Sequence, residues 1–311
     1  MSIKIRGGND LNIEEELGQY LKNGIKKHES LMLYSSWQVG GPADFYLCPA
    51  DCFELIKIVH YCAEYRMPLY VMGNGTNLLV LDGGVRGFVV NIGKAFDYIN
   101  WLDEEIVVGA GTSMTSLARQ ACQKGLVGLE FAAGIPGTLG GAIMMNAGAF
   151  GGNIGEKVES VTVVHYDGTV YSYSRGELIF GYRSCNLNEK GIVIEVRLKL
   201  EKGDAAESLK SMDNIIKERS RRHPTQPSAG SVFRNLPDNP AGYLIESAGG
   251  KGLRIGGAEV SRQHANFIVN TGNATAADIL ALIQAVQQLV KEKHNLDLQP
   301  EVKIIGEGIN G

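Results

Sequence analysis

The chain has 311 residues, of which 44% are hydrophobic and 21% are charged, and this balance is typical of folded soluble proteins rather than of disordered ones. At roughly 150 residues per domain, we expect two or three compact units. The formal net charge of -4 argues against nucleic acid or an anionic membrane as a partner, because both require a positive surface field.

Cysteine and histidine usage indicates a reduced compartment and no metal centre. The 5 cysteines are odd in number and form no C-x-x-C pair, so we expect buried free thiols. The 6 histidines show no H-x-x-x-H spacing, and no metal site is predicted. The N-terminus lacks an apolar signal core and no run of about 18 apolar residues occurs, which predicts a cytoplasmic protein.

The first part of the chain predicts a lead-in helix and an irregular sheet. Residues 11–27 alternate apolar and charged positions at helical spacing, and residues 35–47 are typical of a turn that enters a strand. Asp51 followed by Glu54 is a capping-box signature for a helix that Pro68 ends. A short buried strand at 69–72 comes next. Further short strands are expected at 77–81, 88–92, 98–102 and 106–108.

The middle of the chain predicts a second unit of mixed helix and strand. We expect a helix near 112–123, a glycine-rich stretch at 133–152 and a strand at 192–200. Asp167-Gly168 between apolar runs predicts a β-hairpin.

A boundary near residues 202–204 opens the last unit. Asp204 and Glu207 form another capping-box signature, for a helix that ends in the basic run 217–222, where positive charge complements the helix dipole. A loop at 227–240, helices near 241–247 and 276–293, and strands at 265–269 and 302–305 follow. The fold class is therefore α+β. The predicted units are 1–32, 33–95, 96–203 and 204–311.

Two glycine-rich loops are the strongest functional signals. In the loop 73–77, small residues let backbone N–H groups converge on phosphate oxygens, although Asn-Gly between strands by itself favours a hairpin turn. In the stretch 133–152, glycines recur too densely for a packed helix, which indicates a flat or charged ligand against bare backbone. Neither loop has the spacing of a Rossmann or P-loop fingerprint, and the G-x-S-x-G motif of hydrolases is missing.

Five segments occur in order along the chain: GNGTNLLV, AGIPGTLGGAIMMNAGAFGG, GYRSC, SAGSVFRN and QPEVKIIGE. With them the sequence resembles the UDP-N-acetylenolpyruvoylglucosamine reductase family over residues 33–307. The resemblance implies the FAD-binding fold of the vanillyl-alcohol oxidase group in two subdomains, 33–95 and 96–203, followed by a substrate-binding domain. It matches the short form of the family, which lacks a tyrosine insertion in the third domain.

The resemblance also implies how FAD binds. The loop 73–77 contains no histidine, so attachment should be non-covalent. The implied FAD-binding residues are Gly73, Asn74, Gly75, Thr76, Asn77, Gly134, Pro136, Gly137, Gly140, Gly141, Asn146 and Gly148.

The implied reaction passes hydride from NADPH to FAD and then to the enolpyruvyl group of the UDP-sugar, which yields UDP-N-acetylmuramate for peptidoglycan synthesis. Arg183 would bind the substrate carboxylate as a planar fork. Ser231 would protonate the neighbouring carbon, and Glu301, kept protonated by burial, would hydrogen-bond the enol. Without the motifs, these three residues are more simply a surface ion pair, a turn serine and a strand-end carboxylate.

Further residues are implied for the UDP-sugar, and one arginine of the basic run is an additional candidate for its diphosphate. The implied substrate-binding residues are Tyr182, Arg234, Asn235, Lys251 and His264. Two alternatives stay open: another flavoprotein of the same fold that uses oxygen, and a non-catalytic nucleotide-binding protein. The sequence does not indicate an oligomeric state.

Overall fold

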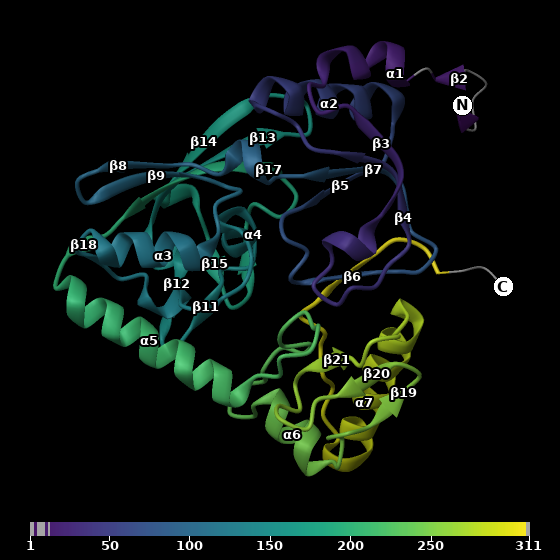
Figure 1. The fold of residues 1–311 in the computed structure, drawn as a ribbon, viewed down its shortest axis with the longest axis vertical. Coiled ribbons are helices and arrows are strands. Elements are labelled where there is room, and N and C mark those ends of the chain that lie inside the picture. Colours follow the sequence, from purple (N-terminus) through teal and green to yellow (C-terminus); the bar gives the residue numbers. More distant parts are fainter. Residues whose placement is uncertain (1–2, 5–9, 12, 309–311) are drawn as a thin grey trace.

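The computed structural model describes residues 3–4, 10–11 and 13–308. Figure 1 shows a first and a second part above, each built on a sheet, and a third, mixed part below. A small antiparallel pair, β1 (Ile3–Lys4) and β2 (Asp10–Leu11), precedes them. No helix among the described residues is long and apolar enough to cross a membrane.

The predicted lead-in helix at 11–27 is wrong over most of its length. The chain forms only a four-residue helix, α1 (Ile13–Glu16), and a 3-10 turn at Gly18–Tyr20, and residue 12 lies outside the described residues. Gly24 adopts φ +65°, a left-handed conformation that ends any helix. Strand β3 (Ile25–Ser30) follows and pairs with the next strand, so the segment becomes a sheet edge.

The first sheet has the order β3-β4-β7-β5. Strands β4 (Pro42–Leu47), β7 (Val85–Asn91) and β5 (Leu69–Met72) are mutually parallel, and helix α2 (Cys52–Tyr65) provides the crossover that parallel strands need. The predicted strand at 69–72 is confirmed, but its burial is not. Tyr70 and Val71 are 36% and 38% exposed, because this end of the sheet faces a cavity.

Helix α2 begins as predicted, with only half of the predicted capping box. The Asp51 carboxylate accepts the backbone N–H of Glu54 at 2.9 Å. The buried Glu54 carboxylate does not return to Asp51 and instead accepts the amides of Ala50 and Lys22. Glu54 thereby ties the N-terminal segment to the start of the helix.

The second sheet is antiparallel, in the order β14-β13-β17-β9-β8. Its strands are β8 (Ile99–Leu102), β9 (Glu105–Gly109), β13 (Val158–His165), β14 (Val170–Ser174) and β17 (Gly191–Lys199). The hairpin predicted at Asp167-Gly168 is confirmed, and the Asp167 carboxylate accepts the amide of Thr169. The short pair β10 (Leu126–Val127) and β18 (Glu201–Lys202) lies at the sheet's margin.

The glycine-rich stretch contains a helix that the sequence did not predict, α4 (Leu139–Met144). The density of glycines does not prevent it, because Gly140 lets the helix approach the chain at Ala110, where the Gly140 amide donates to the Ala110 carbonyl at 2.8 Å. Strands β11 (Gly148–Ala149) and β12 (Gly152–Asn153) form a hairpin just after it.

Helix α5 (Ala205–Arg222) opens the predicted third domain but packs on the second sheet's helix α3 (Met114–Gln123). The Asp204 carboxylate caps it by accepting the amides of Ala206 and Glu207, but Glu207 does not complete the predicted capping box. Met212 is fully buried beside Cys122. In Figure 1 the helix runs along the lower edge from the second part to the third. Helix α5 therefore contributes to the core of the second part, whereas the predicted third domain starts at residue 204.

The third part is built on helices α6 (Ala241–Ser247) and α7 (Ala276–His294). They cover a small antiparallel sheet of β19 (Arg254–Ile255), β20 (Ala258–Val260) and β21 (Ile268–Asn270), of which only the last was predicted, three residues too early. Its core continues into the first part through the fully buried Trp37. The Trp37 indole N–H donates to the carbonyl of Ile268 at 2.7 Å.

The last strand, β22 (Lys303–Ile305), leaves the third part and pairs in parallel with β6 (Leu78–Val80). Asp82, just after β6, also accepts the first amides of α7, at Ala276 and Ala277. The first and third parts are thus joined by a shared core, a strand pair and a helix cap. Glu301 lies at this junction.

Candidate active site

A cavity of about 1720 Å³ lies between the three parts. It exceeds the roughly 300–1,000 Å³ of an ordinary small-molecule site, so it has room for more than one ligand. Its walls come from residues 69–78, most of 134–153, 180–183, part of 218–224, 228–231, and 301 with 303–305. The loops predicted to bind FAD and the three predicted catalytic residues all line this one cavity.

The loop 73–77 presents free backbone donors to the cavity. The amides of residues 74–77 donate to no acceptor within the described part of the chain. Such a run of N–H groups is a nest for an anion such as a pyrophosphate. The hairpin turn considered from sequence does not form, since strands β5 and β6 on either side of the loop do not pair with each other.

Several glycines in these loops serve chain-to-chain contacts. A Cβ on Gly75, which has φ +61°, would lie 1.9 Å from the carbonyl oxygen of Tyr34. A Cβ on Gly73 would lie 2.4 Å from Thr138 Oγ1, and one on Gly137 would lie 2.9 Å from Thr76 Oγ1. The two loops therefore approach each other closely, in addition to any ligand that they bind.

Asn146 and Pro136 hold the glycine-rich stretch in place. The Asn146 side chain donates to the carbonyl of Gly181 and accepts the amide of Gly155, so both of its polar ends bind the chain itself. The carbonyl of Pro136 accepts the Thr76 hydroxyl at 3.5 Å. The remaining predicted FAD residues, among them Asn74, Gly134, Gly141 and Gly148, lie on the cavity wall.

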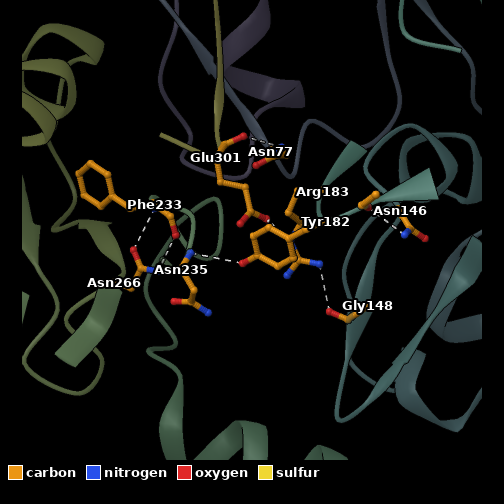
Figure 2. A network of polar contacts seen from close by, with 10 residues as sticks. Asn77, Asn146, Gly148, Tyr182, Arg183, Phe233, Asn235, Asn266 and Glu301 are labelled. Carbon is orange, nitrogen blue, oxygen red and sulfur yellow. Dashed lines mark hydrogen bonds and ion pairs between the residues drawn. The ribbon is translucent and has the colours of Figure 1, made fainter. Parts of the chain in front are cut away.

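Arg183 stands at the tip of a hairpin formed by β15 (Phe180–Gly181) and β16 (Ser184–Cys185). Its backbone has φ +53°, an unusual value for a residue with a side chain. One guanidinium nitrogen donates to the carbonyl of Gly148 at 3.2 Å, and Nε forms an ion pair with Glu301 Oε1 at 2.8 Å (Figure 2). This tight turn aims the charged group across the cavity.

Glu301 reaches the same point from the opposite wall. Its backbone amide donates to the carbonyl of Val232 at 2.7 Å, and its carbonyl accepts the side chain of Asn77. The side chain is 13% exposed, and burial raises the pKa of Glu301 above its ordinary value, while the charges of Arg183 and Arg234 oppose this rise. The solvent-facing carboxylate considered from sequence is therefore not what the structure shows.

Ser231 lies on the cavity wall after Gly230, which has φ +76°. The segment that follows is clamped, because the Asn266 side chain bonds both the amide and the carbonyl of Phe233 (Figure 2). The Ser231 hydroxyl has no hydrogen-bond partner within the described residues, unlike a turn serine that bonds its own backbone.

The predicted substrate residues are not all in the cavity. Tyr182, Asn235 and His264 line it, and the Tyr182 hydroxyl accepts the amide of Asn235 at 3.3 Å. Lys251 does not line the cavity and pairs with Glu246 at 2.7 Å. Arg234 also lies outside the lining, although its charge acts on Glu301.

The sequence interpretation did not single out Arg219, which the structure places on the cavity wall. Its Nε atom is buried without a hydrogen-bond partner in the described chain, and its guanidinium lies over the ring of Phe150. Burial and the nearby charge of Arg183 lower the pKa of Arg219. The signal was the basic run at the end of α5, but helical periodicity does not show that one of its residues turns inward.

The described residues hold no cluster of metal-ligating side chains. What they hold is a nest of backbone donors at one place in the cavity, and an arginine, a buried carboxyl and a free hydroxyl at another. Residues 43–174 match the FAD binding domain family, and residues 222–305 match the UDP-N-acetylenolpyruvoylglucosamine reductase C-terminal domain family. Fold and site together define a flavin-binding enzyme with an added C-terminal domain.

Individual relatives agree with these matches. The chain is 45% identical over 284 residues to the UDP-N-acetylenolpyruvoylglucosamine reductase of Heliobacterium modesticaldum, covering 90% of each chain. It is 40% identical to the enzyme of the same name from Bacillus subtilis, covering 94% of this chain and 96% of that one. The crystal structure of UDP-N-acetylenolpyruvylglucosamine reductase from Thermus caldophilus superposes with a TM-score of 0.80 at 38% identity, covering 91% of this chain and all of that one. The chain belongs to the UDP-N-acetylenolpyruvoylglucosamine reductase family, and the predicted FAD-binding α+β fold is confirmed.

Proposed function

We propose that the protein reduces the enolpyruvyl group of UDP-N-acetylenolpyruvoylglucosamine to give UDP-N-acetylmuramate, with NADPH as the reductant and FAD as the bound cofactor, in cytoplasmic synthesis of peptidoglycan precursors. One observation carries this proposal beyond the family match. Arg183, Ser231 and Glu301 come from three separate segments of the chain and line a single cavity together with the glycine-rich loops. A non-catalytic nucleotide-binding protein has no need of this convergence.

The residues present fit FAD. The free amides of the loop 73–77 suit its pyrophosphate, and non-covalent attachment is consistent with a loop that has no histidine. Tyr70, Val71 and Tyr166 are half exposed and line the cavity, so they offer an apolar surface for a flat ring system. When bound, the flavin supplies hydride transfer, first from NADPH to its ring and then from its ring to the enolpyruvyl group. Protein side chains have no equivalent chemistry.

The protein's own residues would control charge and protons around the substrate. The Arg183 guanidinium binds the enolpyruvyl carboxylate and stabilises negative charge that develops there, a role that suits a cation held rigidly by the Gly148 carbonyl. Ser231 has an unengaged hydroxyl and gives its proton to the neighbouring carbon. Glu301, whose pKa is raised by burial, donates a hydrogen bond to the enol oxygen in its protonated form.

The diphosphate of the UDP-sugar is best matched by Arg219. A buried guanidinium nitrogen without a partner is costly unless a ligand supplies the missing acceptor, and phosphate oxygens are strong acceptors for arginine. Lys251, predicted for this role, is already paired with Glu246. Arg222 lines the cavity as well but forms an ion pair with Glu218, so it is a weaker candidate.

The two half-reactions test the proposal directly. Under anaerobic conditions, NADPH should bleach the flavin absorption of the purified protein, and adding the enolpyruvyl UDP-sugar should restore it with formation of UDP-N-acetylmuramate. If the absorption returned only on admission of air, the protein would instead be an oxygen-using flavoprotein of the same fold.

A further inference from the structure

Arg183 and Glu301 form an ion pair across the cavity. Arg183 Nε lies 2.8 Å from Glu301 Oε1, and both side chains are largely buried, at 23% and 13% exposed. The guanidinium charge favours the ionised form of the carboxyl at this distance, although the Arg183 Nε–H is not aligned on the oxygen as a hydrogen bond. The proposed catalytic role of Glu301 requires the same group to carry a proton. The ion pair and the proposed catalytic role therefore call for different protonation states of one side chain.

The surroundings of Glu301 explain how its state can change. From the hairpin tip it faces Arg183, and from the segment next to its backbone it faces Arg234, while the nearby Asn77 is neutral. Burial raises the pKa of Glu301, and Arg183 is the strongest influence that opposes this rise. If another anion takes over the positive charge of Arg183, the ionised form of Glu301 loses its main stabilising partner.

The substrate brings such an anion. A carboxylate that binds the Nε edge of Arg183 must contact the same nitrogen that Glu301 contacts. Two carboxylates on one guanidinium also repel each other. We propose that the enolpyruvyl carboxylate displaces Glu301 from Arg183 and that Glu301 takes up one proton from solvent as the substrate binds. This inference rests on the proposed function. It makes the substrate responsible for producing the acid form of the residue that acts on it.

Proton uptake can be measured without turnover. The oxidised FAD-loaded protein, with no reductant, is titrated calorimetrically with the enolpyruvyl UDP-sugar in buffers of different ionisation enthalpy near neutral pH. The control ligand is UDP-N-acetylglucosamine, which has the same diphosphate but no carboxylate. We expect about one more proton to be taken up with the enolpyruvyl sugar, and its affinity to fall about tenfold per pH unit in the range where uptake occurs.

The control ligand also accounts for other titrating groups. His223 and His264 lie near the cavity with lowered pKa values, to about 4 for His223, and a diphosphate could protonate either of them. Such protons would appear with both sugars. Equal uptake with the two sugars would overturn the inference, and this comparison needs no variant of the protein.

The variant Glu301→Gln tests whether Glu301 binds the extra proton. The variant should still bind the enolpyruvyl sugar, but the difference in proton uptake between the two sugars should disappear. A difference that persisted in the variant would overturn the assignment to Glu301 and leave the proposed reaction intact. Failure of the unmodified FAD-loaded protein to bind the enolpyruvyl sugar at all would instead refute the proposed function, and this inference with it.

Discussion

The hydroxyl of Ser231 has no partner in the described chain, although its backbone neighbours are firmly clamped by Asn266. A free donor on a fixed segment can deliver a proton without first giving up a hydrogen bond to another protein group. Ser231→Ala should therefore bind FAD and accept hydride from NADPH normally, while turnover falls about 10²–10⁴-fold. Stopped-flow measurement of each half-reaction separates the two steps.

Ser231→Cys is the matched control, since it keeps a proton donor of similar size and should retain more activity than the alanine variant. Near-parental turnover by Ser231→Ala, with flavin occupancy and substrate affinity intact, would remove Ser231 from the mechanism.

Arg183→Lys tests the second reacting residue. Lysine keeps the positive charge but loses the planar fork, and it meets the same backbone strain at φ +53°. We expect NADPH to reduce the flavin at the parental rate and the UDP-sugar to reoxidise it much more slowly. Equal slowing of both steps would indicate a structural role for the hairpin tip.

Arg219 gives a prediction on binding rather than chemistry. Replacing a charge-assisted contact to phosphate costs about 1.5–3 kcal/mol, so Arg219→Met should raise the dissociation constants of both the UDP-sugar and UDP about 10–100-fold. The control is Arg221→Met, which should bind normally. Arg221 is on the same helix, its side chain is 82% exposed and it does not line the cavity. Unchanged UDP binding by Arg219→Met would show that another residue binds the diphosphate.

At the scale of single elements, the glycine loops serve the fold as well as the ligand. Gly75→Ala would place a Cβ 1.9 Å from a backbone oxygen, which cannot move without displacing the turn that precedes Trp37. Gly151→Ala has a comparable φ, +85°, and meets no atom within 4 Å, so it carries only the backbone strain of roughly 1–2 kcal/mol.

Thermal unfolding of the two variants, each stripped of flavin, should show a much larger loss of stability for Gly75→Ala than for Gly151→Ala. Similar stability of the two would mean that Gly75 is required by the ligand alone, as the sequence first suggested.

The sequence predicted most elements whose signals are local. The Asp204 cap, the Asp167-Gly168 hairpin and helix α7 depend on a few neighbouring residues, and the structure confirms them. The helix expected at 11–27 is wrong because the prediction gave apolar spacing more weight than the turn at Gly24. Strands β19 and β20 were too short to produce a pattern.

For the site residues, too, local signals were predictable from sequence and long-range contacts were not. Motifs identified Arg183, Ser231 and Glu301, but no local pattern could show that Arg183 and Glu301 form an ion pair, that Lys251 points elsewhere or that Arg219 turns inward. The ion pair and the inward position of Arg219 depend on contacts between distant parts of the chain, whereas Lys251 pairs with its near neighbour Glu246.

At the scale of the whole molecule, Trp37 joins the first and third parts. It is fully buried in the third part's core and donates a hydrogen bond to Ile268, so its loss should weaken both parts together. Trp37→Ala should cost about 3–5 kcal/mol, in a single unfolding transition of the joined parts. Trp101→Ala, on the partly exposed strand β8, is the control with a smaller cost. Denaturant unfolding monitored by circular dichroism measures both.

The pairing of β22 with β6 also has a consequence for synthesis on the ribosome. The amide of Lys303 donates to the carbonyl of Asn77, so the loop that offers free amides to an anion is supported by a strand that is translated long after it. Contacts between such distant residues form only after the third part has emerged. A nascent chain stalled before residue 299 would expose β6 as an unpaired edge and lack Glu301. Cofactor capture should therefore follow translation of β22, and nascent chains that lack this strand should hold little flavin.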